Sequence, residues 1–325
     1  MKRFGFVFLA IALLAACTEK TDLRSEGEYN EYLAVDATLT DRAEDAQRVY
    51  LSRTVPYFGE AGDHAAAAVE KALVTVADGA ETVRFQEVEP GVYEAPAGFA
   101  AQAGRNYKLR IEEGDEVYEA EASMPEAGFS LDGIDYAWAG NKSMNVDSLW
   151  TVAIWGEDKP QASFYYVSIG VNDLFYPFEL SEVMDDKYFN GNVVNGVPIT
   201  SLMQVHQMQT LYGDCFKYLE TGDVITLRAL TLSKEYYDFL IAVTLNGTLS
   251  SIPLFSPQPA NCPTNIRKLT GGSGPGPGPG DTAIDHVVGY FAVCPVVSAS
   301  VTVEDPLRPY YKRLFPFPFP GGGGQ

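Results

Sequence analysis

Short stretches with strand character recur along residues 32–125, and a turn signal separates each from the next. The stretches are residues 32–39, 49–55, 72–77, 82–86, 92–95, 106–112 and 116–121. Glycine, proline or aspartate stands at most of the corners, as at Asp78-Gly79 and Pro90-Gly91. Short strands about 8–12 residues apart with turn residues between them are typical of antiparallel β-sandwiches. The sequence therefore predicts an N-terminal sandwich domain over residues 32–125.

A second β-rich domain is expected over residues 126–304. Its strand patterns cover residues 149–155, 163–169, 223–231 and 286–303. One helix is predicted over residues 234–246, because Ser233 suits an N-cap, Glu235 suits the first turn and apolar residues follow at helical spacing. We therefore expect a mainly β protein with two domains and one helix. The aromatic residues along one side of this helix are expected to pack in the core.

Two segments have compositions that oppose regular structure. Residues 271–280 read GGSGPGPGPG, and residues 305–325 end in FPFPFPGGGGQ. Glycine loses much backbone entropy on folding, and proline lacks the N–H donor that helices and sheets need. We expect a flexible insert at residues 271–280 and a disordered tail at residues 305–325.

The chain begins with a segment typical of secretion signals. Lys2 and Arg3 precede residues 4–16, which carry no charge and are too few to span a bilayer as a helix. The run Leu14-Ala-Ala-Cys17 resembles the bacterial lipobox. The resemblance implies a signal peptide at residues 1–16, lipidation of Cys17, anchoring in the lipid bilayer and a tether at residues 17–31. The alternative is plain secretion with an incidental cysteine.

Charge and motifs exclude several classes of function. The net charge of −20 opposes binding to nucleic acid and electrostatic docking on anionic lipid. The chain lacks the Ser-hydrolase, zinc-protease and P-loop motifs, so we expect no enzyme, no catalytic residue and no cofactor. The open alternative is a glycan or peptide hydrolase with scattered carboxylates, such as Asp185-Asp186 or Glu112-Glu113.

No metal site is expected. The cysteines and histidines lack the paired spacing of zinc sites. An oxygen-rich calcium loop from Asp185, Asp186, Asn190 and Asn192 is the weaker alternative, because their spacing departs from that of an EF-hand.

Several strings follow one another in the order found in a known family. They are residues 157–166 (EDKPQASFYY), 185–191 (DDKYFNG), 222–228 (GDVITLR), 233–239 (SKEYYDF), 255–266 (FSPQPANCPTNI) and 289–291 (GYF). Together they resemble lipoproteins of Bacteroidota that carry domain of unknown function 4249. The N-terminal strings ALVTVADG, TVRF, EPGVY and GRNYKLRI resemble carboxypeptidase-regulatory modules, which implies an immunoglobulin-like or transthyretin-like sandwich.

The resemblance implies an outer-membrane lipoprotein that serves as a non-catalytic accessory or binding subunit, in association with a TonB-dependent transporter for nutrient uptake. It leaves open whether the protein faces the periplasm or the cell surface. As contacts for the transporter we expect the aromatic residues Phe175, Tyr176 and Phe178 of the second domain. On the strand at 149–155, Trp150 and Trp155 should face opposite sides, because they lie five residues apart.

One disulfide is expected in the mature chain. The secretion signal implies an oxidising compartment, and the three mature cysteines, Cys215, Cys262 and Cys294, allow at most one internal bridge. Cys262 and Cys294 flank the Gly/Pro insert, and the strings that contain them adjoin in the family. We therefore expect a Cys262–Cys294 bridge.

Overall fold

The computed structural model describes residues 31–55, 68–140, 147–177, 181–205, 208–210, 213–249, 262–269 and 287–308. The described residues from Tyr32 onward belong to one compact unit. This unit is mainly β, as predicted, with one long helix, α3 (Lys234–Leu249), and one 3-10 turn, η3 (Asp214–Phe216), among its named elements. In this part of the chain no helix has the length and apolar character needed to cross a membrane.

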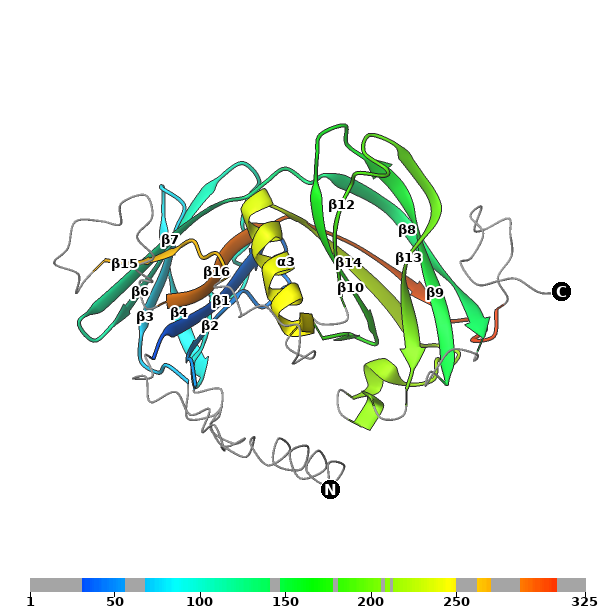
Figure 1. Ribbon diagram of the computed structural model, residues 1–325, viewed down its shortest axis with the longest axis horizontal. Helices are drawn as coiled ribbons and strands as arrows, with labels where there is room; N and C mark the ends of the chain where they lie inside the picture. The colour runs from blue at the N-terminus through cyan, green and yellow to red at the C-terminus, as the bar shows by residue number, and fades with distance from the viewer. Residues whose placement is uncertain are drawn as a thin grey trace, which may run out of the picture. The chain divides into compact units, whose positions relative to one another are not determined.

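The strands of the N-terminal region, together with β15 and β16 from later in the chain, form a nine-stranded sheet (Figure 1). Its order is β15 (Ile266–Lys268), β7 (Glu116–Ser123), β6 (Asn106–Glu113), β3 (Leu73–Ala77), β4 (Thr82–Glu89), β5 (Val92–Glu94), β2 (Arg48–Arg53), β1 (Leu33–Thr40) and β16 (Val287–Cys294). All seven strands expected over residues 32–125 are present. Their inward side chains form one core, which includes Leu39, Phe85 and Leu109.

The expected antiparallel sandwich is not what this sheet forms. Strand β4 pairs with β3 along residues 82–85 and with β5 along residues 86–89, so the sheet turns around its core at β4. Its two end strands meet at Asn265, whose side chain hydrogen-bonds both main-chain groups of Phe291 on β16. The sheet is therefore nearly closed, like a barrel. The pairing of β1 with β16 is parallel, which also departs from the prediction.

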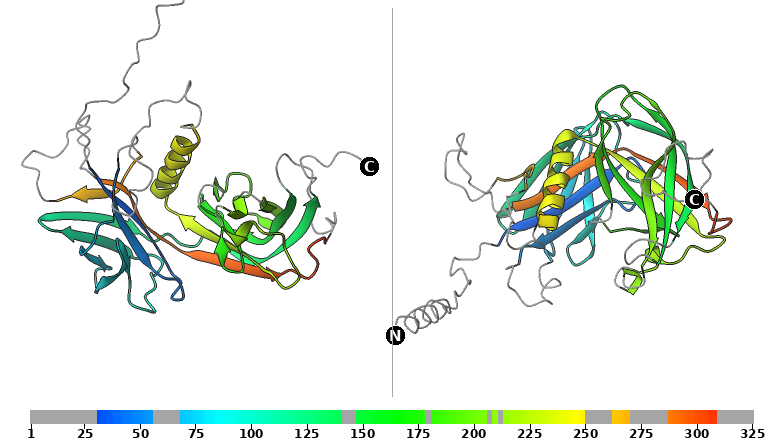
Figure 2. Two further views of the ribbon diagram at one scale, coloured as in Figure 1. Left: turned by 90° about the horizontal axis from the view of Figure 1, so that it is seen from below. Right: turned by 45° about the vertical axis from the view of Figure 1, so that its right-hand side comes forward.

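The expected domain boundary at residue 125 does not follow the sheets. Strands β15 and β16 come from the C-terminal half of the chain, yet they pair with β7 and β1. The strand expected over 286–303 is two strands, β16 and β17 (Val296–Thr302), separated by Pro295. In Figure 2 this orange segment passes from the nine-stranded sheet into another sheet.

The other strands form two sheets that share a second core. One sheet has the order β13 (Val193–Gln204), β9 (Ser148–Asp158) and β8 (Phe129–Gly140). The other contains β11 (Leu174–Phe175), β10 (Phe164–Val171), β14 (Val224–Leu232) and β17, with β12 (Glu182–Asp185) also paired to β10. The shared core includes Tyr136, Trp150 and Leu227, whereas Trp155 packs with Ala137 and Ala153 on the opposite face of β9, as predicted.

Part of the expected tail is packed against this region. Trp150 donates its indole N–H to the carbonyl of Pro306 at 2.6 Å, and Arg308 forms a two-bonded ion pair with Asp135. Residues 305–308 are therefore structured, contrary to the prediction for 305–325. The insert at 271–280 and the rest of the tail lie outside the described residues.

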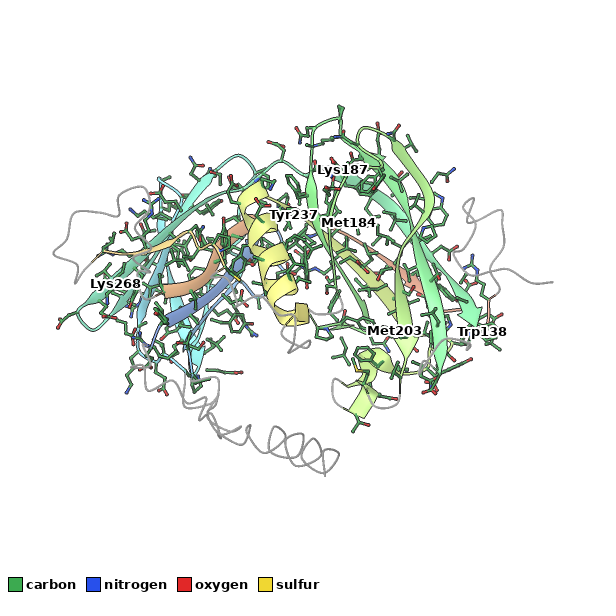
Figure 3. All side chains as sticks on the ribbon, viewed as in Figure 1. Trp138, Met184, Lys187, Met203, Tyr237 and Lys268 are labelled. Atoms are coloured by element: carbon green, nitrogen blue, oxygen red, sulfur yellow. The ribbon has the colours of Figure 1, made fainter. Side chains whose placement is uncertain are left out.

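Helix α3 packs against β16 and β10. The backbone N–H of Tyr236 donates to Ser233 Oγ at 3.2 Å, which confirms the predicted N-cap, but the helix continues to Leu249 instead of ending at 246. Tyr236 and Leu240 are buried against Tyr290 and Cys294. Tyr237, labelled in Figure 3, packs on the ring of Phe164 with centroids 4.7 Å apart. The aromatic stripe of α3 is core packing, as predicted.

Candidate functional site

A cavity of about 720 Å³ lies beside α3 and is the candidate site. It opens between the outer face of β1, β2 and β16, the outer face of β10 and β14, and the helix. Its lining side chains include Asp36, Thr38, Asp45, Tyr50, Tyr166, Arg228, Leu230, Tyr236, Phe239 and Tyr290. The cavity thus combines aromatic walls with a few polar groups.

Strand alternation in β1 places polar side chains toward this cavity. Leu33, Val35, Ala37 and Leu39 are buried in the core of the nine-stranded sheet. Successive side chains of a strand point to opposite faces, so the intervening residues, including Asp36 and Thr38, face outward. On an uncovered sheet these groups would be solvated. Here α3 and the five-stranded sheet turn the same face into a wall of the cavity.

Asp36 stands between two tyrosines on this wall. It pairs with Tyr50 on β2 and with Tyr290 on β16 in the strand register. In the antiparallel pair with Tyr50, directly opposed Cβ atoms are about 4.5–5.5 Å apart. Its side chain is exposed to the cavity, while the surrounding protein raises the pKa of the carboxyl by desolvation alone. Among the described residues it has no hydrogen bond or ion pair.

The aromatic wall is organised by α3. The ring of Tyr290 stacks on Tyr236 and lies against Phe239, with both centroid distances at 5.1 Å. The hydroxyl of Tyr236 shares a 2.7 Å hydrogen bond with Thr38 Oγ1, which fixes the helix to β1. These contacts hold three rings of the cavity lining, which also includes Asp36, in fixed positions.

Arg228 is the one cation among the described residues that line the cavity, and it is already paired with a carboxylate. Arg228 Nη1 donates to Asp45 Oδ1 at 3.0 Å, and its Nη2 donates to the other carboxylate oxygen. Asp45 Oδ2 also accepts a 2.9 Å bond from Thr40 Oγ1. A two-bonded Arg–carboxylate pair of this kind is strong and directional. The unpaired charge left among the lining residues is therefore that of Asp36.

The three expected partner contacts have different positions. Phe175 is half-buried, and the Arg228 guanidinium lies 5.9 Å from its ring centroid. Tyr176 is buried, stacks on Phe216 at 4.5 Å and accepts a 2.6 Å bond from the Met203 N–H. Its placement in the core corrects its assignment as a contact residue. Phe178 lies outside the described residues.

The one cysteine whose surroundings the structure describes in detail, Cys294, is not in a reactive state. Cys294 is a buried free thiol on β16, and burial raises its pKa, which disfavours the reactive thiolate. The expected Cys262–Cys294 bridge stays a prediction. Cys17 lies outside the described residues.

The acidic strings considered for catalysis or calcium organise local structure. Asp158 and Asp186 are both buried, and burial raises the pKa of Asp186. Asp158 accepts bonds from the Tyr165 hydroxyl and the Gly191 N–H, while Asp186 accepts one from the Ser163 N–H at 2.6 Å.

Neighbouring acids are held in ion pairs. Asp185 pairs with Lys187 at 3.3 Å, and Glu112 and Glu113 pair with Arg110 and Arg53. In the described part of the chain no three Asp, Glu, His or Cys residues form a group able to hold a metal.

Sequence reasoning missed the cavity and its residues. The signal for Asp36 was present, since it is a charged residue on the non-core side of an alternating strand. Nothing local to β1 indicated that α3, some 200 residues later in the chain, would cover that face.

The chain matches no curated protein. Residues 19–300 match a family model described as "Domain of unknown function (DUF4249)". This match covers most of the 325 residues, including the elements that line the cavity. The chain belongs to the DUF4249 family.

Proposed function

We propose that the protein is a lipid-anchored, non-catalytic binding protein whose ligand occupies the cavity beside α3. The observation that carries this proposal is a cavity of about 720 Å³ with an unpaired carboxyl in an aromatic wall. Ligand sites are commonly about 300–1,000 Å³, mostly apolar, with a few polar groups that orient the ligand. The cavity beside α3 has each of these properties.

The anchor and the partner rest on the N-terminal sequence and on the resemblance stated above. Cys17 follows a lipobox-like run, so the mature protein would be held at the outer membrane by its acyl chains. A TonB-dependent transporter would be the partner, and delivery of a nutrient to it would be the role. Phe175 is the remaining contact candidate among the described residues.

The hydrolase alternative is less well supported. A glycosidase needs two carboxyl groups with separate acid and base roles. The acids that line the cavity are Asp36 and Asp45, and Asp45 is bound to both Arg228 and Thr40. A carboxylate held in this way is a poor nucleophile or base, which favours binding over cleavage.

Isolation of the lipidated protein from its own membranes in mild detergent tests the proposal. Wild-type protein should be membrane-bound and should recover a TonB-dependent transporter, as identified by mass spectrometry. The Cys17→Ser variant should be released from the membrane and should lose the lipid label. A membrane-free wild type, or recovery without any transporter, contradicts the proposal. Hydrolysis of glycans or peptides by the purified protein would support the alternative.

A further inference from the structure

We propose that the cavity beside α3 selects small organic cations, with a protonated amine held by Asp36 among the aromatic rings. This inference rests on the proposed function, because it names the ligand class of the same cavity. It follows from the charges, the rings and the size of the site.

The charges in the wall favour a cation. Arg228 and Asp45 cancel one another, so the carboxyl of Asp36 gives the lining a net negative charge. An anionic ligand would either have to displace Asp45 from the Arg228 guanidinium or lie near the like charge of Asp36 without a cationic partner. The chain as a whole carries a net charge of −20, which also attracts cations and repels anions.

The rings supply a second attraction for a cation. Tyr50 and Tyr290 flank Asp36 in the strand register, and Tyr236 and Phe239 pack against Tyr290. The negative face of an aromatic ring attracts an ammonium group within about 6 Å of its centroid. A carboxylate flanked by such rings favours an amine over a neutral alcohol of the same shape, because an alcohol gains neither the charge pair nor the full ring interaction.

The unpaired state of Asp36 also points to a ligand. The Asp36 side chain is exposed to the cavity and has no hydrogen-bond or ion-pair partner among the described residues. Every other acid in the lining has its partner within the fold, as Asp45 does. A bound ammonium would give Asp36 the charge pair that the described residues do not provide.

Three probes of nearly equal shape test the selection: phenethylammonium, the neutral 2-phenylethanol and the anion phenylacetate. Binding to the full mature protein is measured by titration in nuclear magnetic resonance. Phenethylammonium should bind at least about tenfold more tightly than 2-phenylethanol, which corresponds to about 1.4 kcal/mol, and phenylacetate should bind most weakly. A lysine-containing peptide is then added to the protein with bound phenethylammonium. Displacement of the probe shows that the cavity also accepts amines on a protein chain, and no displacement shows that it selects free small amines.

Two variants tie the selection to the site. Asp36→Asn keeps the shape of the side chain and should remove most of the preference for the cation over the alcohol. Tyr50→Leu should weaken the binding of phenethylammonium several-fold, whereas Tyr50→Phe should bind it with the affinity of the wild type. The matched control is Asp115→Asn, because Asp115 is an exposed acid in the turn between β6 and β7, outside the cavity. Circular dichroism verifies that each variant is folded.

The outcomes separate the two proposals. Equal binding of all three probes, unchanged in Asp36→Asn, overturns the selection for cations while the binding function stands. Failure of every probe to bind the folded wild type overturns the selection as well, and retention of the transporter in the membrane isolation then decides the proposed function separately.

Discussion

Replacing Asn265 with alanine should open the nearly closed nine-stranded sheet at its seam. The side-chain amide of Asn265 accepts a 3.0 Å bond from the N–H of Phe291 and donates a 2.8 Å bond to its carbonyl. It also donates to the carbonyl of Glu121 on β7 at 3.1 Å. Strand β16 is an end strand of the sheet, so this one amide satisfies main-chain groups of Phe291 that no further strand pairs with.

The magnitude follows from the burial of Phe291. Its side chain is fully buried, and Asn265→Ala leaves its N–H and its carbonyl without their partner. A buried polar group left unsatisfied costs about 1–3 kcal/mol, so the two groups together cost about 2–6 kcal/mol. The free energy of unfolding of a typical domain is about 5–15 kcal/mol, so the loss should be large on that scale.

Urea unfolding followed by circular dichroism and tryptophan fluorescence measures this change. Asn265→Asp should be about as destabilised as Asn265→Ala, because a carboxylate oxygen would then face the carbonyls of Phe291 and Glu121. The control is Asn192→Ala, since the Asn192 side chain is exposed and donates a local hydrogen bond, to the Asn190 carbonyl. It should change stability by less than about 0.5 kcal/mol. If Asn265→Ala also stays within that range, the reasoning about the seam is wrong.

Three further predictions concern the cavity wall and the cysteines. Gly289→Ala should lower the free energy of unfolding by more than about 1–2 kcal/mol, which is the cost of a left-handed backbone alone. Gly289 has φ +99°, and an added Cβ would also lie 1.9 Å from the Val35 carbonyl oxygen. A thermal midpoint equal to wild type refutes this. The pKa of Asp36 is raised in the folded protein, so its contribution to stability is present below the unfolded pKa and is lost as pH rises through the folded pKa. Asp36→Asn should therefore be at least as stable as wild type at neutral pH and less dependent on pH in the acidic range, and a large loss of stability at neutral pH would contradict the absence of a partner. Non-reducing peptide mapping should recover a Cys262–Cys294 bridge worth about 3–4 kcal/mol on the chain-entropy model, and a bridge through Cys215 or free thiols at both positions would refute it.

Local patterns in the sequence predicted the elements better than their partners. The alternation of β1 and the cap at Ser233 are properties of a few consecutive residues, and both agree with the structure. The pairing of β16 with β1 joins residues more than 250 positions apart, and no local pattern encodes it. The sheets do not follow the expected domain boundary for this reason, since that boundary assumed that each sheet was built from one continuous part of the chain.

Irregular pairing accounts for two of the strands that the sequence did not predict, β13 and β8. In β13 the register shifts between Asn195 and Val197 and again between Pro198 and Thr200, so the two-residue period is interrupted twice. Strand β8 has a similar shift between Leu131 and Gly133. A bulge adds a residue to one strand and thereby reverses the alternation beyond it. Sequence periodicity therefore gave no clear signal for either strand.

The residues of the candidate site show the same limit. Tyr176 is buried, whereas the adjacent Phe175 is half-buried. The burial of Tyr176 depends on stacking against Phe216, which lies 40 positions later in the chain. Asp36 is the opposite case, because alternation places it on a solvated face of β1, and a distant helix makes that face one wall of a cavity. In both cases the function of a side chain depends on a long-range contact, which composition and spacing do not specify.

The most direct test of the account is a structure of the protein with phenethylammonium, determined at a concentration that saturates binding in solution. The probe should lie in the cavity beside α3. Its ammonium should be within hydrogen-bond distance of the Asp36 carboxylate and over the ring of Tyr50 or Tyr290. A probe bound elsewhere on the protein, or a cavity without the probe at saturation, would contradict the claim that this cavity is the ligand site.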